Sequence, residues 1–215
     1  MIKRLERALV AAMLATVLAS SLAGTARAQA NDRLAMLTEG TGNITAGRAA
    51  SAPVGYVQFC AKNPADCGRG NGRGGRIQLD AAEYAQLRQV NDQINERIQP
   101  LTDLEHYGEV ERWTYPDDGY GDCEDYVLLK RRTLISLGWP AETLLVAVVR
   151  DKKGDGHAVL MVATDHGDLV LDNQEAEILP WYETGYRYVK RQKQGDPDAW
   201  VSLGDIGAPA TVGRN

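Results

Sequence analysis

Apolar residues recur at helical spacing between Asp80 and Ile98. They lie three or four positions apart, as on the buried face of a helix: Tyr84, Leu87, Val90 (or Asn91), Ile94 and Ile98. Asp80 and Glu83 have the spacing of a capping box, and Pro100 closes the segment. We therefore expect a helix that packs against the core and does not itself form a site.

A second helix is predicted to begin near Asp122 and Cys123. It should end at Gly138, because glycine is common just past a helix end and Pro140 follows. Residues 126–129 are Tyr, Val, Leu and Leu, which leave no polar side on that turn. The first half of this helix should therefore be buried.

Continuous apolar runs follow the second helix. Residues 143–150 and 157–164 are rich in aliphatic and β-branched side chains, and a short DKKGDG segment joins them. A turn at 165–168 leads into LVLD at 169–172, and residues 186–192 are compatible with a last strand. This order predicts an α+β domain with N-terminal helices packed on an antiparallel β-sheet.

The first 28 residues have the organisation of a secretory signal peptide. Basic residues open the segment, an apolar stretch runs from Ala8 to Ala19, and Ala26-Arg27-Ala28 fits a small-x-small cleavage site. That stretch is too short to span a membrane in the mature protein, and no later segment is apolar enough to do so. We expect a periplasmic or secreted protein with no transmembrane segment after cleavage, and an uncleaved anchor is the alternative.

The composition of the chain indicates two irregular segments and argues against one class of partner. Residues 29–53 are rich in Ala, Gly, Thr and Asn without a sustained period, and we interpret them as a flexible leader. The Gly-rich segment 68–76 is interpreted as a loop, because no strand precedes its GxGxxG-like spacing. The formal net charge of −5 becomes −8 once residues 1–28 are removed. This balance argues against nucleic-acid binding, which requires basic side chains.

Export would place the three cysteines in an oxidising compartment. Cys60 and Cys67 flank Pro64 in FCAKNPADC and could close a small loop, whereas Cys123 has no neighbour in the sequence. Cys123 is then a reactive thiol or forms an intermolecular bridge, unless it pairs with one of the other two cysteines.

Cys123, His157 and Asp172 together suggest a catalytic triad. Cys123 falls at a helix N-terminus, where the dipole and unpaired N–H groups favour a thiolate nucleophile and could stabilise an oxyanion. His157 opens an otherwise apolar strand and Asp172 ends the next one. These residue types supply a nucleophile, a general base and a group that orients the base. A hairpin that pairs Met161 with Asp172 puts His157 and Asp172 on one face, but about 13 Å apart along the strand.

Acidic residues surround the candidate nucleophile. Asp122, Glu124 and Asp125 should raise the pKa of a nearby thiol, and capping of the helix is the simplest explanation for them. Their grouping also suits a hard cation such as Ca²⁺, which would offset the repulsion. Trp113 is expected to be a packed aromatic, with a place in a substrate groove or oxyanion hole as the alternative.

The segments WTYPDDGYGDCEDYVLLKRRTLISLGWP and GHAVLMVATDHGDLVLDN closely resemble the bacterial transglutaminase-like cysteine peptidases, including the LapG-type periplasmic proteases. The resemblance runs over residues 54–192, which we take as a papain/transglutaminase-like domain, and leaves 193–215 as a C-terminal tail. It implies that Cys123 is the nucleophile, His157 the base and Asp172 its orienting acid. It also implies that Asp122 and Glu124 bind calcium, and it leaves the role of Asp125 open.

The resemblance further implies two partners. One is a protein substrate, a large surface adhesin of biofilm cells that is cut near its N-terminus, and the other is an inner-membrane receptor that senses cyclic di-GMP. Two alternatives stay open from the residues alone. The thioester could be passed to an amine or used on cell-wall peptides, or the chain could be a non-catalytic calcium-binding adaptor in which Cys123 is disulfide-bonded.

Overall fold

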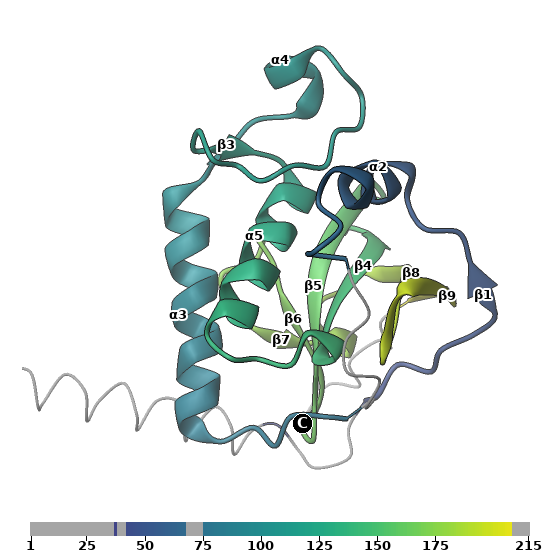
Figure 1. Ribbon diagram of the computed structural model, residues 1–215. Coiled ribbons are helices and arrows are strands. Elements are labelled where there is room, and N and C mark those ends of the chain that lie inside the picture. The colour runs from purple at the N-terminus through teal and green to yellow at the C-terminus, as the bar shows by residue number, and fades with distance from the viewer. Residues whose placement is uncertain (1–36, 38–41, 68–74, 208–215) are drawn as a thin grey trace, which may run out of the picture.

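The computed structural model describes residue 37, residues 42–67 and residues 75–207 (Figure 1). The helices are α2 (Val54–Lys62), α3 (Ala81–Arg97), α4 (Asp103–Tyr107) and α5 (Cys123–Ser136), with 3₁₀ turns η1 (Ala141–Thr143) and η2 (Trp181–Glu183). The strands are β1 (Ala49–Ala50), β2 (Gln99–Pro100), β3 (Tyr120–Gly121), β4 (Leu144–Arg150), β5 (Gly156–Thr164), β6 (Gly167–Leu171), β7 (Leu179–Pro180), β8 (Arg187–Lys193) and β9 (Asp196–Gly207). The expected signal peptide and most of the Gly-rich segment lie outside the described residues.

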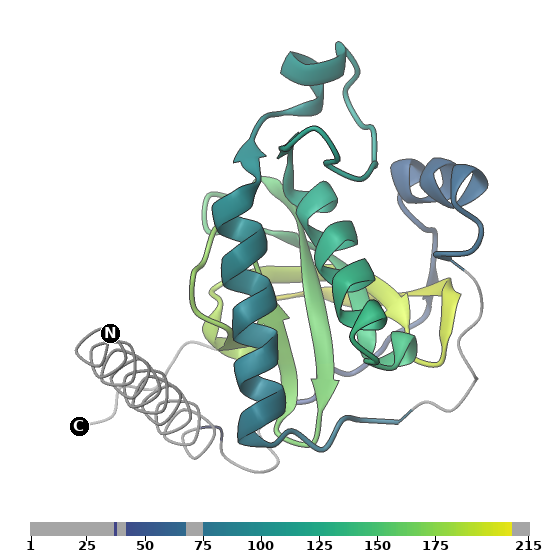
Figure 2. The ribbon, with the colours of Figure 1, turned by 60° about the vertical axis from the view of Figure 1, so that its left-hand side comes forward.

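Seven of the strands form one antiparallel sheet in the order β1-β9-β8-β4-β5-β6-β7. Strands β4 to β7 are neighbours in chain order, whereas β8 returns to pair with the other edge of β4. Figures 1 and 2 show α3 and α5 side by side on one face of this sheet. The α+β class with helices on an antiparallel sheet is therefore confirmed.

Both faces of the central strands are buried. In β4, Leu144 and Val146 pack into the core beneath the helices, whereas Leu145 and Ala147 belong to a second core on the opposite face. Because neither face meets water, these strands are continuously apolar and show no alternation. This explains why the sequence predicted them by composition and not by period.

The two long helices begin where the sequence predicts. Asp80 accepts hydrogen bonds from Ala82 N and Glu83 N at 2.7 and 2.8 Å, and Glu83 bonds back to Asp80 N at 2.8 Å, so the capping box is present. Helix α5 starts at Cys123, its residues 126–131 are buried, and Gly138 follows it with φ +96°. The predicted burial of its first half is confirmed.

The sheet extends beyond the residues that the sequence assigned to the domain. Strand β1 precedes residue 54, and Ile44 N donates to the Asp168 carboxylate at 2.9 Å, so part of the expected leader is built into the fold. Strand β9 follows residue 192 and pairs with β8, so the expected tail begins with a strand. Strand β1 has two residues and β9 is of mixed polarity, so neither gives a strong sequence signal, which is why the expected domain left them out.

Helix α2 is an element that the sequence analysis did not predict. Its Tyr56 and Phe59 are buried in the core beneath the helices. Cys60 near its end is disulfide-bonded to Cys67, and Cys123 is a free cysteine. Of the two pairings left open by the sequence, the short loop is the one present.

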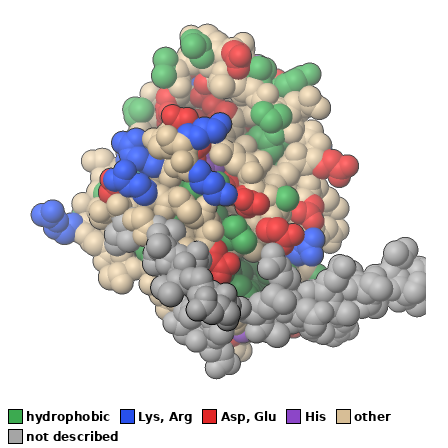
Figure 3. All heavy atoms as spheres, turned by 180° about the vertical axis from the view of Figure 1, so that it is seen from behind, with side chains coloured by type: hydrophobic (Ala, Val, Ile, Leu, Met, Phe, Trp, Pro, Cys, Tyr) green, Lys and Arg blue, Asp and Glu red, His purple; other side chains and the backbone are tan. Residues whose placement is uncertain are grey.

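No uniform charge covers the face opposite the view of Figure 1. This face carries both signs, with most of the basic side chains gathered toward one side (Figure 3).

Every helix within the described part of the chain is too short or too polar to traverse a lipid bilayer.

Lys130 of α5 is buried, with 1% of its surface exposed. Burial lowers its pKa to about 7, although Asp172 and Asp92 act in the opposite direction. Between pH 7 and 10.5 the unfolded chain therefore binds more protons at this residue than the folded chain does, and stability should rise with pH. We predict that Lys130→Met increases the thermal unfolding midpoint at pH 7 and that the increase shrinks toward pH 10. A gain that is independent of pH would contradict this.

Candidate active site

Cys123 is the first residue of α5 and is partly exposed. Its Sγ accepts a hydrogen bond from Ala158 N of β5 at 3.4 Å, and the thiol donates to Glu124 Oε2 at 3.1 Å. Burial, followed by the charge of Glu124, raises the pKa of the thiol well above its ordinary value. The structure therefore places the thiol beside the first residues of β5.

His157 and Asp172 are in direct contact. His157 Nε2 lies 2.8 Å from Asp172 Oδ1, and both side chains are buried. The hairpin turns at residues 165–166, so that Met161 pairs with Val170. The register expected from the sequence, which paired Met161 with Asp172, is wrong by two positions, because the turn is two residues long. The shorter turn reduces the predicted separation of the two residues along the strand from four positions to two.

Hydrogen bonds hold the Asp172 side chain and backbone from several elements. Tyr186 Oη donates to Oδ2 at 2.5 Å, Gln174 N donates to Oδ1 at 3.0 Å, and Asn95 of α3 donates to the Asp172 carbonyl at 2.7 Å. Burial alone would raise the pKa of Asp172, but the hydrogen bonds and charge of His157, with the Tyr186 hydroxyl, outweigh burial and lower it. Asp172 is therefore a fixed, ionised partner for the imidazole.

Cys123 and His157 line one cleft of about 240 Å³. Because Asp172 occupies Nε2 of His157, its Nδ1 is the nitrogen left for proton transfer, and Gln174 Nε2 lies 3.3 Å from it. The other residues around the cleft come from the N-cap of α2, from the segment before α5, from α5 itself and from β4, β5 and β8: Pro53, Glu111, Trp113, Glu124, Val148, Gly156, Ala158 and Lys190. An extended peptide segment could reach the thiol through this opening.

Trp113 is packed and also lines the cleft. Its ring is 6% exposed and meets Tyr56 edge-on at 5.7 Å, and its Nε1 donates to Glu111 at 2.7 Å. A side chain at Gly55 would collide with the indole, which explains the glycine there. Since the indole N–H is already engaged, the packed position expected from the sequence is the one observed.

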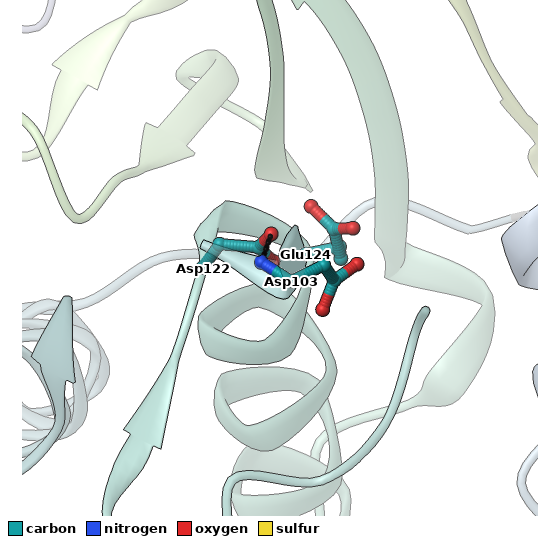
Figure 4. A group of neighbouring side chains, drawn as sticks. All are labelled: Asp103, Asp122 and Glu124. Atoms are coloured by element: carbon teal, nitrogen blue, oxygen red, sulfur yellow. Dashed lines mark hydrogen bonds between the residues drawn. The ribbon is translucent and has the colours of Figure 1, made fainter. Parts of the chain in front are cut away.

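Three carboxylates gather at the start of α5 (Figure 4). Oxygen atoms of Asp103, Asp122 and Glu124 all lie within 4.8 Å of one another. Asp122 is the N-cap residue of α5 but makes no capping hydrogen bond with its side chain, and its Oδ1 is buried without a partner. Capping therefore does not account for this acid. Hard oxygen donors at this spacing suit a divalent cation such as Ca²⁺.

Burial raises the pKa of each acid in this region. The pKa of Glu124 rises to about 9, with the Asp122 charge as the second cause, and the pKa values of Asp103 and Asp122 rise as well. Asp125 lies outside the cluster, accepts a hydrogen bond from Thr114 N at 2.9 Å, and has its pKa raised to about 8 by burial. Without a compensating positive charge, these carboxylates are not stable together in ionised form.

Three residues that contact the candidate site were not predicted from the sequence. Asp103 lies 19 positions before Asp122, and the pattern around it indicates only a helix start, with Thr102 and Glu105 as a capping box. Gln174 follows Asp172 closely, and a turn at that point was the available signal. Tyr186 was assigned to a strand by its apolar character, and nothing in the sequence relates it to Asp172.

A thiol at a helix start beside a buried His–Asp pair is the arrangement of a cysteine proteinase. Residues 46–208 match the family Peptidase_C93, described as the bacterial transglutaminase-like cysteine proteinase BTLCP. The chain therefore belongs to this family, which confirms the resemblance found in the sequence. No curated protein matches the chain.

Solved structures of LapG from Legionella pneumophila are similar to the chain. The calcium-bound form is 24% identical over 59% of this chain and 72% of that chain, with a TM-score of 0.47. The EGTA-treated form is 27% identical over 50% and 62%, with a TM-score of 0.44. A third LapG structure is 27% identical over 56% and 69%, with a TM-score of 0.47.

The disulfide assignment predicts the thiol content of the folded protein. Alkylation without reduction should modify one cysteine, Cys123, because Cys60 and Cys67 are joined in a disulfide and Cys123 is free and partly exposed. Peptide mass mapping should recover Cys60 and Cys67 as a linked pair. Recovery of Cys123 in a disulfide would contradict the assignment.

Proposed function

We propose that this chain is an exported cysteine endopeptidase with the triad Cys123, His157 and Asp172. The observation that carries the proposal is the buried 2.8 Å contact between His157 and Asp172, in a cleft that the Cys123 thiol also lines. Membership of a cysteine proteinase family supports it. Cys123 is a free cysteine, which argues against the alternative of an adaptor domain in which this cysteine is disulfide-bonded.

In the proposed reaction, His157 acts as the general base through Nδ1. Asp172 holds the proton on Nε2, so the lone pair is on Nδ1 and can accept the thiol proton. The thiol must first turn away from Glu124, and Nδ1 must exchange its contact with Gln174 for the thiol. Asp172, which stays ionised, then stabilises the imidazolium that forms.

Sγ attacks the carbonyl carbon of the scissile peptide bond. The tetrahedral oxyanion would be stabilised by N–H groups in the first turn of α5. His157 returns the proton to the leaving amine, the C–N bond breaks, and a thioester forms on Cys123. Water, deprotonated by the same imidazole, then hydrolyses the thioester and releases the acid product.

Asp103, Asp122 and Glu124 fit a calcium site, because they bring three carboxylates together around an oxygen that has no partner. A bound calcium ion would supply positive charge that keeps all three acids ionised and fixes the turn before Cys123. The acids themselves tie α4 to the start of α5, since Asp122 also accepts a hydrogen bond from Asp103 N at 3.4 Å.

The proposed substrate is a surface protein, such as a large biofilm adhesin, in accordance with the resemblance to the LapG-type proteases. The proposed location is the periplasm or the exterior, which suits the Cys60–Cys67 disulfide. An inner-membrane receptor for cyclic di-GMP that sequesters the enzyme is part of the same proposal. Substrate and receptor both rest on the family resemblance.

Cys123→Ala should abolish proteolysis and leave the fold intact. We expect a loss of about 10⁴-fold or more in rate, because no other group can form the thioester. The measurement is mass spectrometry of surface proteins released by cells with the wild-type or the Cys123→Ala protein, and circular dichroism of the purified variant is the control for folding. Release of the same surface proteins by cells with the Cys123→Ala protein would contradict the proposed mechanism.

Removal of calcium should stop cleavage, and its return should restore it. In calorimetry, Asp103→Asn should weaken Ca²⁺ binding by about tenfold or more, because it removes one carboxylate of the cluster without touching the thiol. Asp103→Asn should also reduce the rise in unfolding temperature that Ca²⁺ produces. Asp92→Asn is the matched control, since Asp92 is an exposed acid of α3 that pairs with Arg88. Equal Ca²⁺ binding by both variants would contradict the proposed site.

A further inference from the structure

Tyr186 lies between η2 and β8, outside the residues that line the cleft. It is 3% exposed and belongs to the core on the sheet face away from the helices. Its hydroxyl donates to Asp172 Oδ2 at 2.5 Å, in a buried hydrogen bond. The ring also meets the imidazole of His157 edge-on, with 5.7 Å between centroids and an interplanar angle of 82°. One side chain therefore contacts both members of the His–Asp pair.

These two contacts restrict different motions. Asp172 Oδ1 accepts hydrogen bonds from His157 and from Gln174 N, whereas Oδ2 is held by Tyr186. Rotation of the carboxylate would therefore have to break the bond to Tyr186, and tilting of the imidazole would meet its ring. Hydrogen bonds to ionised groups are worth more than neutral ones, and their loss in a buried site is correspondingly costly.

A neighbouring tyrosine offers a direct comparison. Tyr188 is 0% exposed and belongs to the same core, and its hydroxyl meets Thr184 Oγ1 at 3.1 Å instead of Asp172. Tyr186 and Tyr188 thus share burial and packing, and differ in what the hydroxyl contacts. Packing alone does not explain why one of them is bonded to Asp172.

We propose that Tyr186 is a positioning residue for the reaction, which fixes the Asp172 carboxylate and thereby the orientation and basicity of His157. This rests on the proposed function of the triad. The hydroxyl does not touch substrate. It acts by donating its proton to Oδ2, which spreads the negative charge of the carboxylate and keeps Oδ1 directed at Nε2 of His157.

Removal of the hydroxyl has a defined effect on proton affinity. Without that donor, the Asp172 carboxylate is more basic and stabilises the imidazolium of His157 more strongly. As the pH falls, His157 therefore takes up its proton, and stops acting as a base, at a higher pH. Other charged or titratable groups near the pair are kept in the variant: Cys123 and Glu124 in the cleft, Lys130 of α5, Tyr188 of β8, and Asp151 and Glu175 in the loops. A shift in the acid limb of the rate profile would therefore be due to Tyr186.

The experiment compares Tyr186→Phe with Tyr188→Phe in the full chain with Ca²⁺ present. For Tyr186→Phe we expect kcat to fall about tenfold to a hundredfold with KM unchanged, and the acid limb of kcat/KM to move up by about half a pH unit. Tyr188→Phe should have wild-type kinetics and an unfolding temperature similar to that of Tyr186→Phe. Unchanged kcat and pH profile in Tyr186→Phe, or equal effects in both variants, would overturn the proposal.

A second readout does not depend on turnover. The titration of the His157 imidazole, followed by NMR on histidine-labelled protein, should move to higher pH in Tyr186→Phe and stay in place in Tyr188→Phe. Incorporation of 3-fluorotyrosine at position 186 keeps the ring and strengthens the donor, so it should move the titration the other way. An unchanged His157 titration in both position-186 variants would overturn the proposal, even where Tyr186→Phe is unstable.

The two proposals fail in distinguishable ways. If Cys123→Ala retains activity, the proposed triad is wrong, whatever Tyr186 does. If wild-type protein cleaves its substrate, Cys123→Ala does not, and Tyr186→Phe matches wild type in rate and pH profile, the triad stands and Tyr186 is merely structural.

Discussion

The packing of α5 against β5 is the contact on which the site depends. Residues of both elements share the core beneath the helices, and Ala158 of β5 lies against the start of the helix, where its N–H meets Cys123 Sγ at 3.4 Å. A larger side chain than Ala158 would move the helix away from the strand, because interiors are close-packed. The thiol therefore lies beside the start of β5, next to His157, as a consequence of core packing.

The same placement creates an electrostatic problem. Bringing Asp103, Asp122 and Glu124 to a buried helix start raises the pKa of every one of them, and the charge of Glu124 also raises that of the thiol. A helix N-terminus favours negative charge by roughly 0.3–1 kcal/mol, which is small beside the cost of grouping three buried acids. A cation would resolve both difficulties at once, since it would hold the carboxylates and withdraw Glu124 from the thiol.

The sequence predicted the parts of this structure that depend on local pattern. The capping box at Asp80, the start of α5 at Cys123 and the apolar strands were all found, because each is encoded within a few residues. The pairing of β5 with β6 was misplaced by two positions, since a turn of two residues and one of four leave the same face buried. Asp103 and Tyr186 reach the site through tertiary contacts, for which a single sequence carries no periodic signal.

The site joins the two faces of the sheet. Cys123 belongs with the helices, whereas Tyr186 belongs to the opposite core, and His157 is at the strand end between them. Side chains from opposite faces meet only where a strand ends, which explains why His157 is the first side chain of β5 and Asp172 the first residue after β6. The position of the His157–Asp172 pair therefore depends on both cores. Packing around Tyr186, which does not itself line the cleft, can then alter His157, which does.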